Sequence, residues 1–130
     1  VSGSAFRWNQ TGVRVAGSSS EGSGSNQLRE PRCVYVDANE TLYICDSGNH
    51  RIQRWVKGAS VGTTVAGGSA GTTLTQLNGP RGLTFDKNGF MYVADTENHR
   101  ILRYTLTSTV GTLVVGTTGV GGSANNLLVK

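Results

Sequence analysis

The sequence has 130 residues, a length that fits one domain or part of one. It contains 19 glycines and only 15% charged residues, a composition that disfavours a helical bundle and favours short strands joined by Gly-rich turns. No apolar run approaches the roughly 18 residues of a membrane-spanning helix, so no membrane span is predicted. The net charge of +4 permits an acidic partner without requiring one.

The N-terminal residues 1–27 are predicted to hold the second half of a repeating unit. Phe6-Arg7-Trp8 matches residues 53–55 as a third strand, and residues 14–17 (RVAG) match residues 64–67 as a fourth strand. A Ser/Gly-rich linker completes this segment, and we expect it to be a flexible connection, like the later Gly-rich linkers.

Two full units follow, residues 28–76 and residues 77–125, because several motifs recur at a constant spacing of 49 residues. The run LYICD beginning at Leu42 recurs as MYVAD beginning at Met91, and NHRIQRW beginning at Asn49 recurs as NHRILRY beginning at Asn98. Residues 126–130 are expected to begin a further unit.

Each unit is predicted to form four short strands. In the second unit we expect them at residues 81–86, 90–95, 100–105 and 110–116, with a hairpin turn at Lys87-Asn88-Gly89. The first two strands of a unit are apolar on both faces, which indicates a sheet covered on both sides. Four-stranded sheets that repeat every 40 to 50 residues are typical of propeller blades. The predicted fold is therefore all-β, with about two and a half β-propeller blades of antiparallel strands.

The repeated unit resembles the NHL repeat. The resemblance rests on residues 80–104, PRGLTFD, then NGFMYVAD, then NHRILRY, and on the same pattern in residues 31–55. It implies a β-propeller, usually of about six blades, so two and a half blades are incomplete as a closed propeller. Either the chain is part of a longer propeller, or further copies complete it by blade-to-blade stacking or by supplying strands.

Charged and histidine side chains also recur in register between the two units. This repetition predicts a structural network of ion pairs and turns within each blade, and we expect the histidines to lie in turns. The predicted network consists of Asp46, His50, Arg51 and Arg54 in the first unit and Asp95, His99, Arg100 and Arg103 in the second. No catalytic, cofactor-binding or metal-binding residue is predicted, and no cofactor.

Cys33 and Cys45 lie in the predicted first and second strands of one unit. If residues 38–40 form a three-residue hairpin loop, the two cysteines face each other and can form a disulfide in an oxidising compartment. The equivalent residues of the next unit are the small Gly82 and Ala94. A two-residue loop would shift the register, and the alternative is then two buried free thiols in an intracellular protein.

Two N-glycosylation sequons begin at Asn9 and Asn39, and Asn39 lies at the predicted hairpin tip. Together with the cysteine pair they favour a secreted, extracellular protein with N-linked glycans.

The function predicted from these features is that of a non-enzymatic extracellular scaffold or protein-interaction module. Its partner would be another protein or further copies of the chain, and nucleic acid is disfavoured because the basic residues are not clustered with exposed aromatic residues. Three alternatives remain: a self-assembling subunit of an oligomer or fibre, part of an NHL-type metal-dependent lyase, and an RNA-binding NHL domain.

Overall fold

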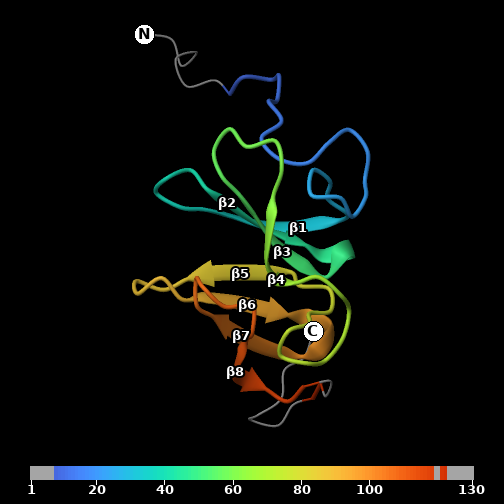
Figure 1. Ribbon diagram of the computed structural model, residues 1–130, viewed down its shortest axis with the longest axis vertical. Coiled ribbons are helices and arrows are strands. Elements are labelled where there is room, and N and C mark those ends of the chain that lie inside the picture. The colour runs from blue at the N-terminus through green and yellow to red at the C-terminus, as the bar shows by residue number, and fades with distance from the viewer. Residues whose placement is uncertain (1–7, 119–120, 123–130) are drawn as a thin grey trace.

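The computed structural model describes residues 8–118 and 121–122 and contains two four-stranded antiparallel sheets. Strands follow chain order in each sheet, and the two sheets stack on each other (Figure 1). The first sheet, here called the first blade, comprises β1 (Pro31–Val36), β2 (Leu42–Asp46), β3 (Arg51–Trp55) and β4 (Thr63–Gly67). The second blade comprises β5 (Gly82–Phe85), β6 (Met91–Asp95), β7 (Arg100–Tyr104) and β8 (Thr112–Gly116). The predicted all-β blade architecture is confirmed.

Short 3-10 turns join the second and third strands of each blade. They are η2 (Ser47–Asn49) and η3 (Thr96–Asn98), and each ends at a histidine in the left-handed conformation. Among the described residues, no helix is long and apolar enough to cross a membrane.

The first two strands of each blade, β1–β2 and β5–β6, form a hairpin that we call the inner hairpin. A three-residue loop sets the register of each inner hairpin. In the first blade the Asp37 N–H donates to the Thr41 carbonyl over 3.1 Å, and Glu40 adopts a left-handed φ of 61°. Gly89, with a φ of 86°, holds the equivalent place in the second blade, where such a backbone conformation is natural for glycine. The loop at residues 38–40 pairs Cys33 with Cys45, as the sequence predicted.

Each blade has one face toward the preceding repeat, here called its upstream face, and one toward the following repeat, its downstream face. Neighbours across the strands share a face, so pairing assigns every side chain to one of them. The apolar residues of the downstream face of the first blade are Cys33, Tyr35, Tyr43, Cys45, Ile52 and Ala66. The upstream face of the second blade consists of Leu83, Phe85, Met91, Val93, Leu102 and Tyr104.

These two faces pack together and form the hydrophobic core. The Phe85 ring lies 5.0 Å from the Tyr35 ring and 4.6 Å from the Tyr43 ring, measured between centroids. Met91, Val93, Leu102 and Tyr104 are almost completely buried. The core therefore lies between the blades, so each blade depends on its neighbour for burial.

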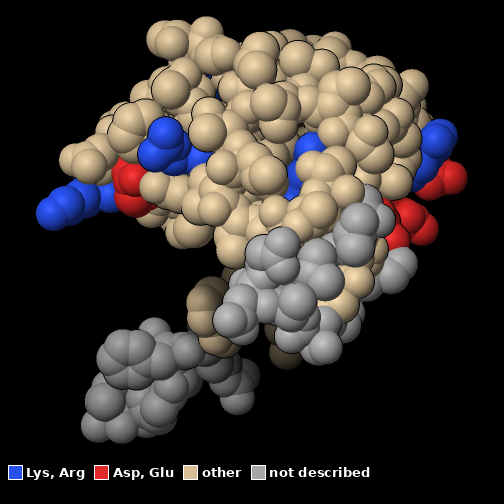
Figure 2. Space-filling model, turned by 90° about the horizontal axis from the view of Figure 1, so that it is seen from below, with Lys and Arg blue, Asp and Glu red and all other residues tan. Residues whose placement is uncertain are grey.

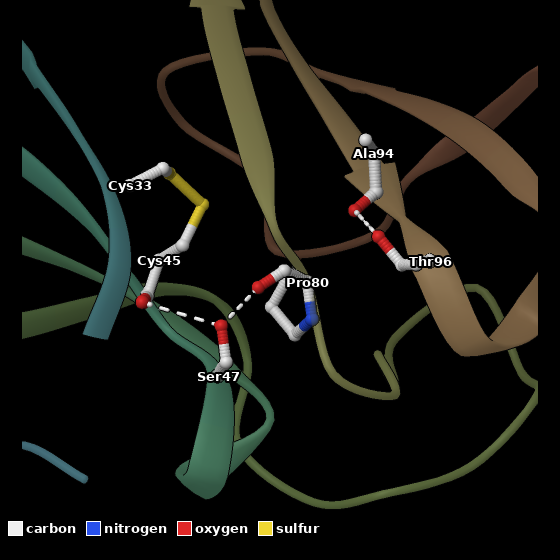
Figure 3. The surroundings of a disulfide bond; sticks show 6 residues. All are labelled: Cys33, Cys45, Ser47, Pro80, Ala94 and Thr96. Carbon is white, nitrogen blue, oxygen red and sulfur yellow. Dashed lines mark hydrogen bonds between the residues drawn. A yellow bond between two sulfur atoms is a disulfide. The ribbon is translucent and has the colours of Figure 1, made fainter. Parts of the chain in front are cut away.

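A disulfide joins Cys33 and Cys45 across β1 and β2, with their Cα atoms 4.9 Å apart. The bond lies on the downstream face, against the second blade (Figure 3). It fastens the inner hairpin whose tip carries Asn39.

The predicted half-blade at the N-terminus is not seen as strands. Residues 14–17 form no β-strand, and of the predicted third strand only Trp8 is among the described residues. Even so, Gly17 packs against Leu28 in the same way that Gly67, at the end of β4, packs against Leu77. Residues 14–17 therefore lie where the fourth strand of a preceding blade would end. Residues 126–130 lie outside the described part of the chain.

The second blade should accept a disulfide at the position equivalent to Cys33 and Cys45. A Cβ built on Gly82 would lie 3.6 Å from the Cβ of Ala94, within the separation that a disulfide spans. The double variant Gly82→Cys/Ala94→Cys should therefore oxidise spontaneously and yield a protein with two disulfides and no free thiol. Thiol counting and non-reducing peptide mapping measure this. Two persistent free thiols would contradict the register assigned to β5 and β6.

Candidate functional site

A buried carboxylate at the end of β2 organises the first blade. One oxygen of Asp46 accepts the backbone N–H of Arg29 over 2.7 Å. The other accepts the Asn49 side-chain amide at 2.9 Å and the Arg51 Nε at 2.6 Å. Asp46 is fully buried and Arg51 is 8% exposed, so this ion pair is shielded from solvent.

The remaining donors of Arg51 bind the linker that precedes the blade. Its guanidinium donates to the carbonyls of Ser23, Gly24 and Gln27 over 3.0 to 3.1 Å. The Asn49 amide also donates to the carbonyl of Gly22. We call the Asp–Asn–Arg group of each blade its clamp, because it fixes the linker to the sheet.

The second blade repeats the clamp atom for atom. Asp95 accepts from the Asn78 N–H at 2.7 Å, from the Asn98 amide at 2.9 Å and from the Arg100 Nε at 2.7 Å. Arg100 donates to the linker carbonyls of Thr72, Thr73 and Gln76 and to the Thr118 hydroxyl. A buried charge is tolerated here because hydrogen bonds satisfy both partners.

The clamps contradict the flexibility that the composition predicts for the Gly-rich linkers. Hydrogen bonds from the clamp fix residues 22–27 and residues 71–76. At Gly71 the absence of a side chain leaves room for the Gln76 amide, because a Cβ there would lie 2.0 Å from the Gln76 Oε1. The clamp asparagines, Asn49 and Asn98, were missed as functional residues, although their recurrence at the 49-residue spacing was a usable signal.

Arg54 and Arg103 lie outside the clamps, which corrects their place in the predicted network. Both are on the strand faces, paired across the sheet with Tyr43 and Tyr92. The Arg103 guanidinium lies over the Phe90 ring, 4.9 Å from its centroid, as a cation–π contact.

The two histidines lie in turns, as predicted, and the ring of His50 reaches the junction between the blades. His50, with φ of 54°, uses Nδ1 to accept the backbone N–H of Gly79 at 3.1 Å, which joins the first blade to the start of the second. His99 has the same backbone conformation, with φ of 55°. Its Nδ1 is buried and has no hydrogen-bond partner among the described residues.

A hydroxyl next to each histidine follows the same pattern. Ser47 donates from its Oγ to the carbonyl of Pro80, across the junction between the blades (Figure 3). Thr96 holds the equivalent place in the second blade, and its hydroxyl turns back to the Ala94 carbonyl at 3.3 Å.

The sequon asparagines are both on the surface. Asn39 is exposed at the tip of the inner hairpin, with its N–H bonded to the Asp37 carboxylate at 2.9 Å. Asn9 is exposed too, and its side-chain oxygen accepts the Thr11 N–H.

Charged side chains outside the clamps are dispersed. Figure 2 shows a largely neutral face on which basic and acidic groups lie next to each other at the edges. A cleft at the blade junction mixes both signs, with Arg29, Arg32 and Arg81 near Glu30 and Glu97. Within the described part of the chain, no group of three or more His, Cys, Asp or Glu could hold a metal ion.

Comparison with known proteins identifies the repeated unit. The family model described as NHL repeat matches residues 28–55 and again residues 77–104. These two segments contain the inner hairpin, the turn and the third strand of each blade. The chain therefore carries two NHL repeats. No curated protein matches the chain.

Loss of a clamp arginine should cost far more stability than loss of the neighbouring strand arginine. Arg100→Met leaves Asp95 buried without its counter-charge, which is expected to lower the free energy of unfolding by about 3–5 kcal/mol. Arg103→Met removes the cation–π contact with Phe90, worth about 0.5–1 kcal/mol, and a charge interaction with Asp86. Chemical denaturation of both variants measures the difference, and equal effects would show that the clamp is not a main source of stability.

The second hairpin should be sensitive to acid through Asp86. Partial burial by itself raises the pKa of this carboxyl, but hydrogen bonds from the Phe90 N–H, Tyr92 hydroxyl and Asn88 N–H, and the Arg103 charge, bring the pKa below its usual 3.8. Because the folded-state pKa is depressed, this contribution is present above pH 3.8 and is lost as the pH falls through the folded-state pKa. Asp86→Asn should therefore flatten the stability profile below about pH 4. Denaturation measured across that pH range checks this. If the variant lost stability below pH 4 as steeply as the unmodified chain, Asp86 would not be the source of the acid sensitivity.

Proposed function

We propose that the chain acts as a non-enzymatic, extracellular scaffold and protein-interaction module built from NHL blades. The observation that carries the proposal is the Cys33–Cys45 disulfide within the inner hairpin. Disulfides form and persist in oxidising compartments and are rare in the cytosol, so this bond supports secretion. The exposed sequon at Asn39 lies at the tip of the same hairpin and is open to a glycan.

The use of the buried ionisable groups supports a scaffold. Asp46, Arg51, Asp95 and Arg100 hold the linkers and the blades, and their hydrogen bonds are committed to this role. The clamps fix the path of the linkers, and linker carbonyls in turn accept the N–H groups of Gly62 and Gly111 in the loops at the blade ends. A frame of this kind presents loops and blade faces to another protein.

A protein partner fits the surface better than a nucleic acid. A nucleic-acid site usually combines a continuous basic patch with stacking aromatic residues. Here the basic residues lie beside acidic ones, and Arg81 is 3.5 Å from Glu97. No specific observation favours an enzymatic role. The metal-dependent lyase remains an alternative only because the repeats resemble those of NHL-type lyases.

The proposal predicts a secreted, disulfide-bonded glycoprotein. Native protein from its source should leave Cys33 and Cys45 unreactive to alkylation until reduction, and its mass should fall on treatment with an N-glycosidase. When the chain is expressed behind a secretion signal, Asn39→Gln should remove the glycan at the hairpin tip, with Asn9→Gln as the matched comparison. Native protein with both cysteines alkylated before reduction would contradict an extracellular role.

A further inference from the structure

The downstream face of the second blade keeps most of the apolar positions that the first blade uses to hold its neighbour, although Thr84 stands where the first blade has Tyr35. Its other residues include Gly82, Tyr92, Ala94, Ile101 and Val115, at the positions equivalent to Cys33, Tyr43, Cys45, Ile52 and Ala66. Ile52 and Cys45 are fully buried by the second blade, whereas Ile101 and Ala94 are half-buried and Val115 is 40% exposed. None of the described residues covers this apolar surface completely.

The polar contacts of the junction are likewise unused on this face. His50 accepts the Gly79 N–H and Ser47 donates to the Pro80 carbonyl, whereas the Nδ1 of His99 is buried without a described partner. A buried acceptor without a donor is costly, so the histidine indicates where a backbone N–H belongs.

The first blade carries the matching surface on its upstream side. Val34 and Val36 are 61% and 54% exposed there, next to Leu42 and Ile44. These positions are equivalent to Leu83, Phe85, Met91 and Val93, which pack against a downstream face within the chain. The backbone before β1 also resembles the backbone before β5. Glu30 is equivalent to Gly79, and both are left-handed, with φ of 47° and 58°.

We propose that the downstream face of the second blade binds the upstream face of the first blade of another copy of this chain. This inference rests on the proposed interaction function and names the partner and the surface. In the contact, the Glu30 N–H of one copy donates to the His99 Nδ1 of the next, and Thr96 reaches the Pro31 carbonyl. Contacts of this kind join head to tail and form a ring or an open chain of copies.

One segment has to move for the copies to join. Residues 14–17 lie over Leu28, where β8 of the other copy would end, since a Cβ on Gly17 lies 3.3 Å from the Leu28 side chain. None of the described backbone hydrogen bonds outside the sheets fastens residues 14–17 to the first blade. Displacing them therefore breaks no described backbone hydrogen bond to the first blade.

The test uses two variants of the full 130-residue chain, each blocked on one face. Ile101→Arg places a charge on the downstream face of the second blade, and Val34→Arg places one on the upstream face of the first blade. Sedimentation equilibrium of the unmodified chain should show a mass that rises with concentration above the monomer mass of 13.7 kDa. Each variant alone should stay monomeric, while Val110→Arg, at an exposed residue outside both faces, should behave as the unmodified chain does.

Mixing the two blocked variants decides the geometry. Each retains the face that the other lacks, so an equimolar mixture should form a 1:1 dimer and nothing larger. His99→Gly keeps a residue that tolerates the left-handed backbone and removes the side-chain acceptor, and it should weaken association roughly threefold to tenfold. Circular dichroism of each variant checks that it is folded.

Two results would overturn the proposal. An unmodified chain that stays monomeric at every concentration would show that its faces do not recognise each other, and the occupant is then a blade of another sequence. A mixture that remains monomeric, or variants that associate as strongly as the unmodified chain, would exclude the head-to-tail contact. Either result leaves the scaffold proposal standing if the native protein is secreted with its disulfide, whereas cytosolic protein with free thiols refutes that proposal independently.

Discussion

The structure depends on the buried clamp in which an aspartate, an asparagine and an arginine tie each blade to the linker in front of it. Asp46 and Asp95 end the second strands, and they position arginines whose other donors bind linker carbonyls. A Gly-rich linker has little apolar surface and cannot bury itself. The clamp replaces that missing hydrophobic contribution with charge-assisted hydrogen bonds in a dry environment. The path of the chain between blades is thereby fixed, which lets two thin sheets stack in one register.

Stacking then determines where the surfaces available for interaction lie. A single blade has two apolar faces, and the only extensive core among the described residues lies between the first and second blades. The outer faces remain partly exposed, with Val34 and Val36 on one side and Ile101 and Val115 on the other. The repeat that builds the core therefore also builds its own interaction surfaces, because equivalent residues occupy equivalent faces.

Much of this could be predicted from the sequence because the repeat is close and in register. Motifs that recur every 49 residues predict the two blades and the order of their strands. A three-residue loop at residues 38–40 predicts the pairing of Cys33 with Cys45, which the structure contains. The linkers could not be predicted in the same way, since a Ser/Gly-rich composition is equally compatible with disorder and with a loop held by distant donors. Arg54 and Arg51 are likewise indistinguishable by residue type, and only the pairing of strands places one on a face and the other in the clamp. The missing partner of His99 depends on three-dimensional burial, which the NHR motif alone does not reveal.

The clamp account is tested most directly by amide hydrogen exchange in the linker between the two blades. The Asn78 N–H donates to the buried Asp95 carboxylate, and the Gly71 N–H donates to the Leu77 carbonyl within the same loop. If the clamp integrates the linker into the fold, these two amides exchange as slowly as those of β6, through the same opening of the blade. If they exchange at the rate of an unstructured peptide while β6 stays protected, the linker is a flexible tether and the central claim is wrong.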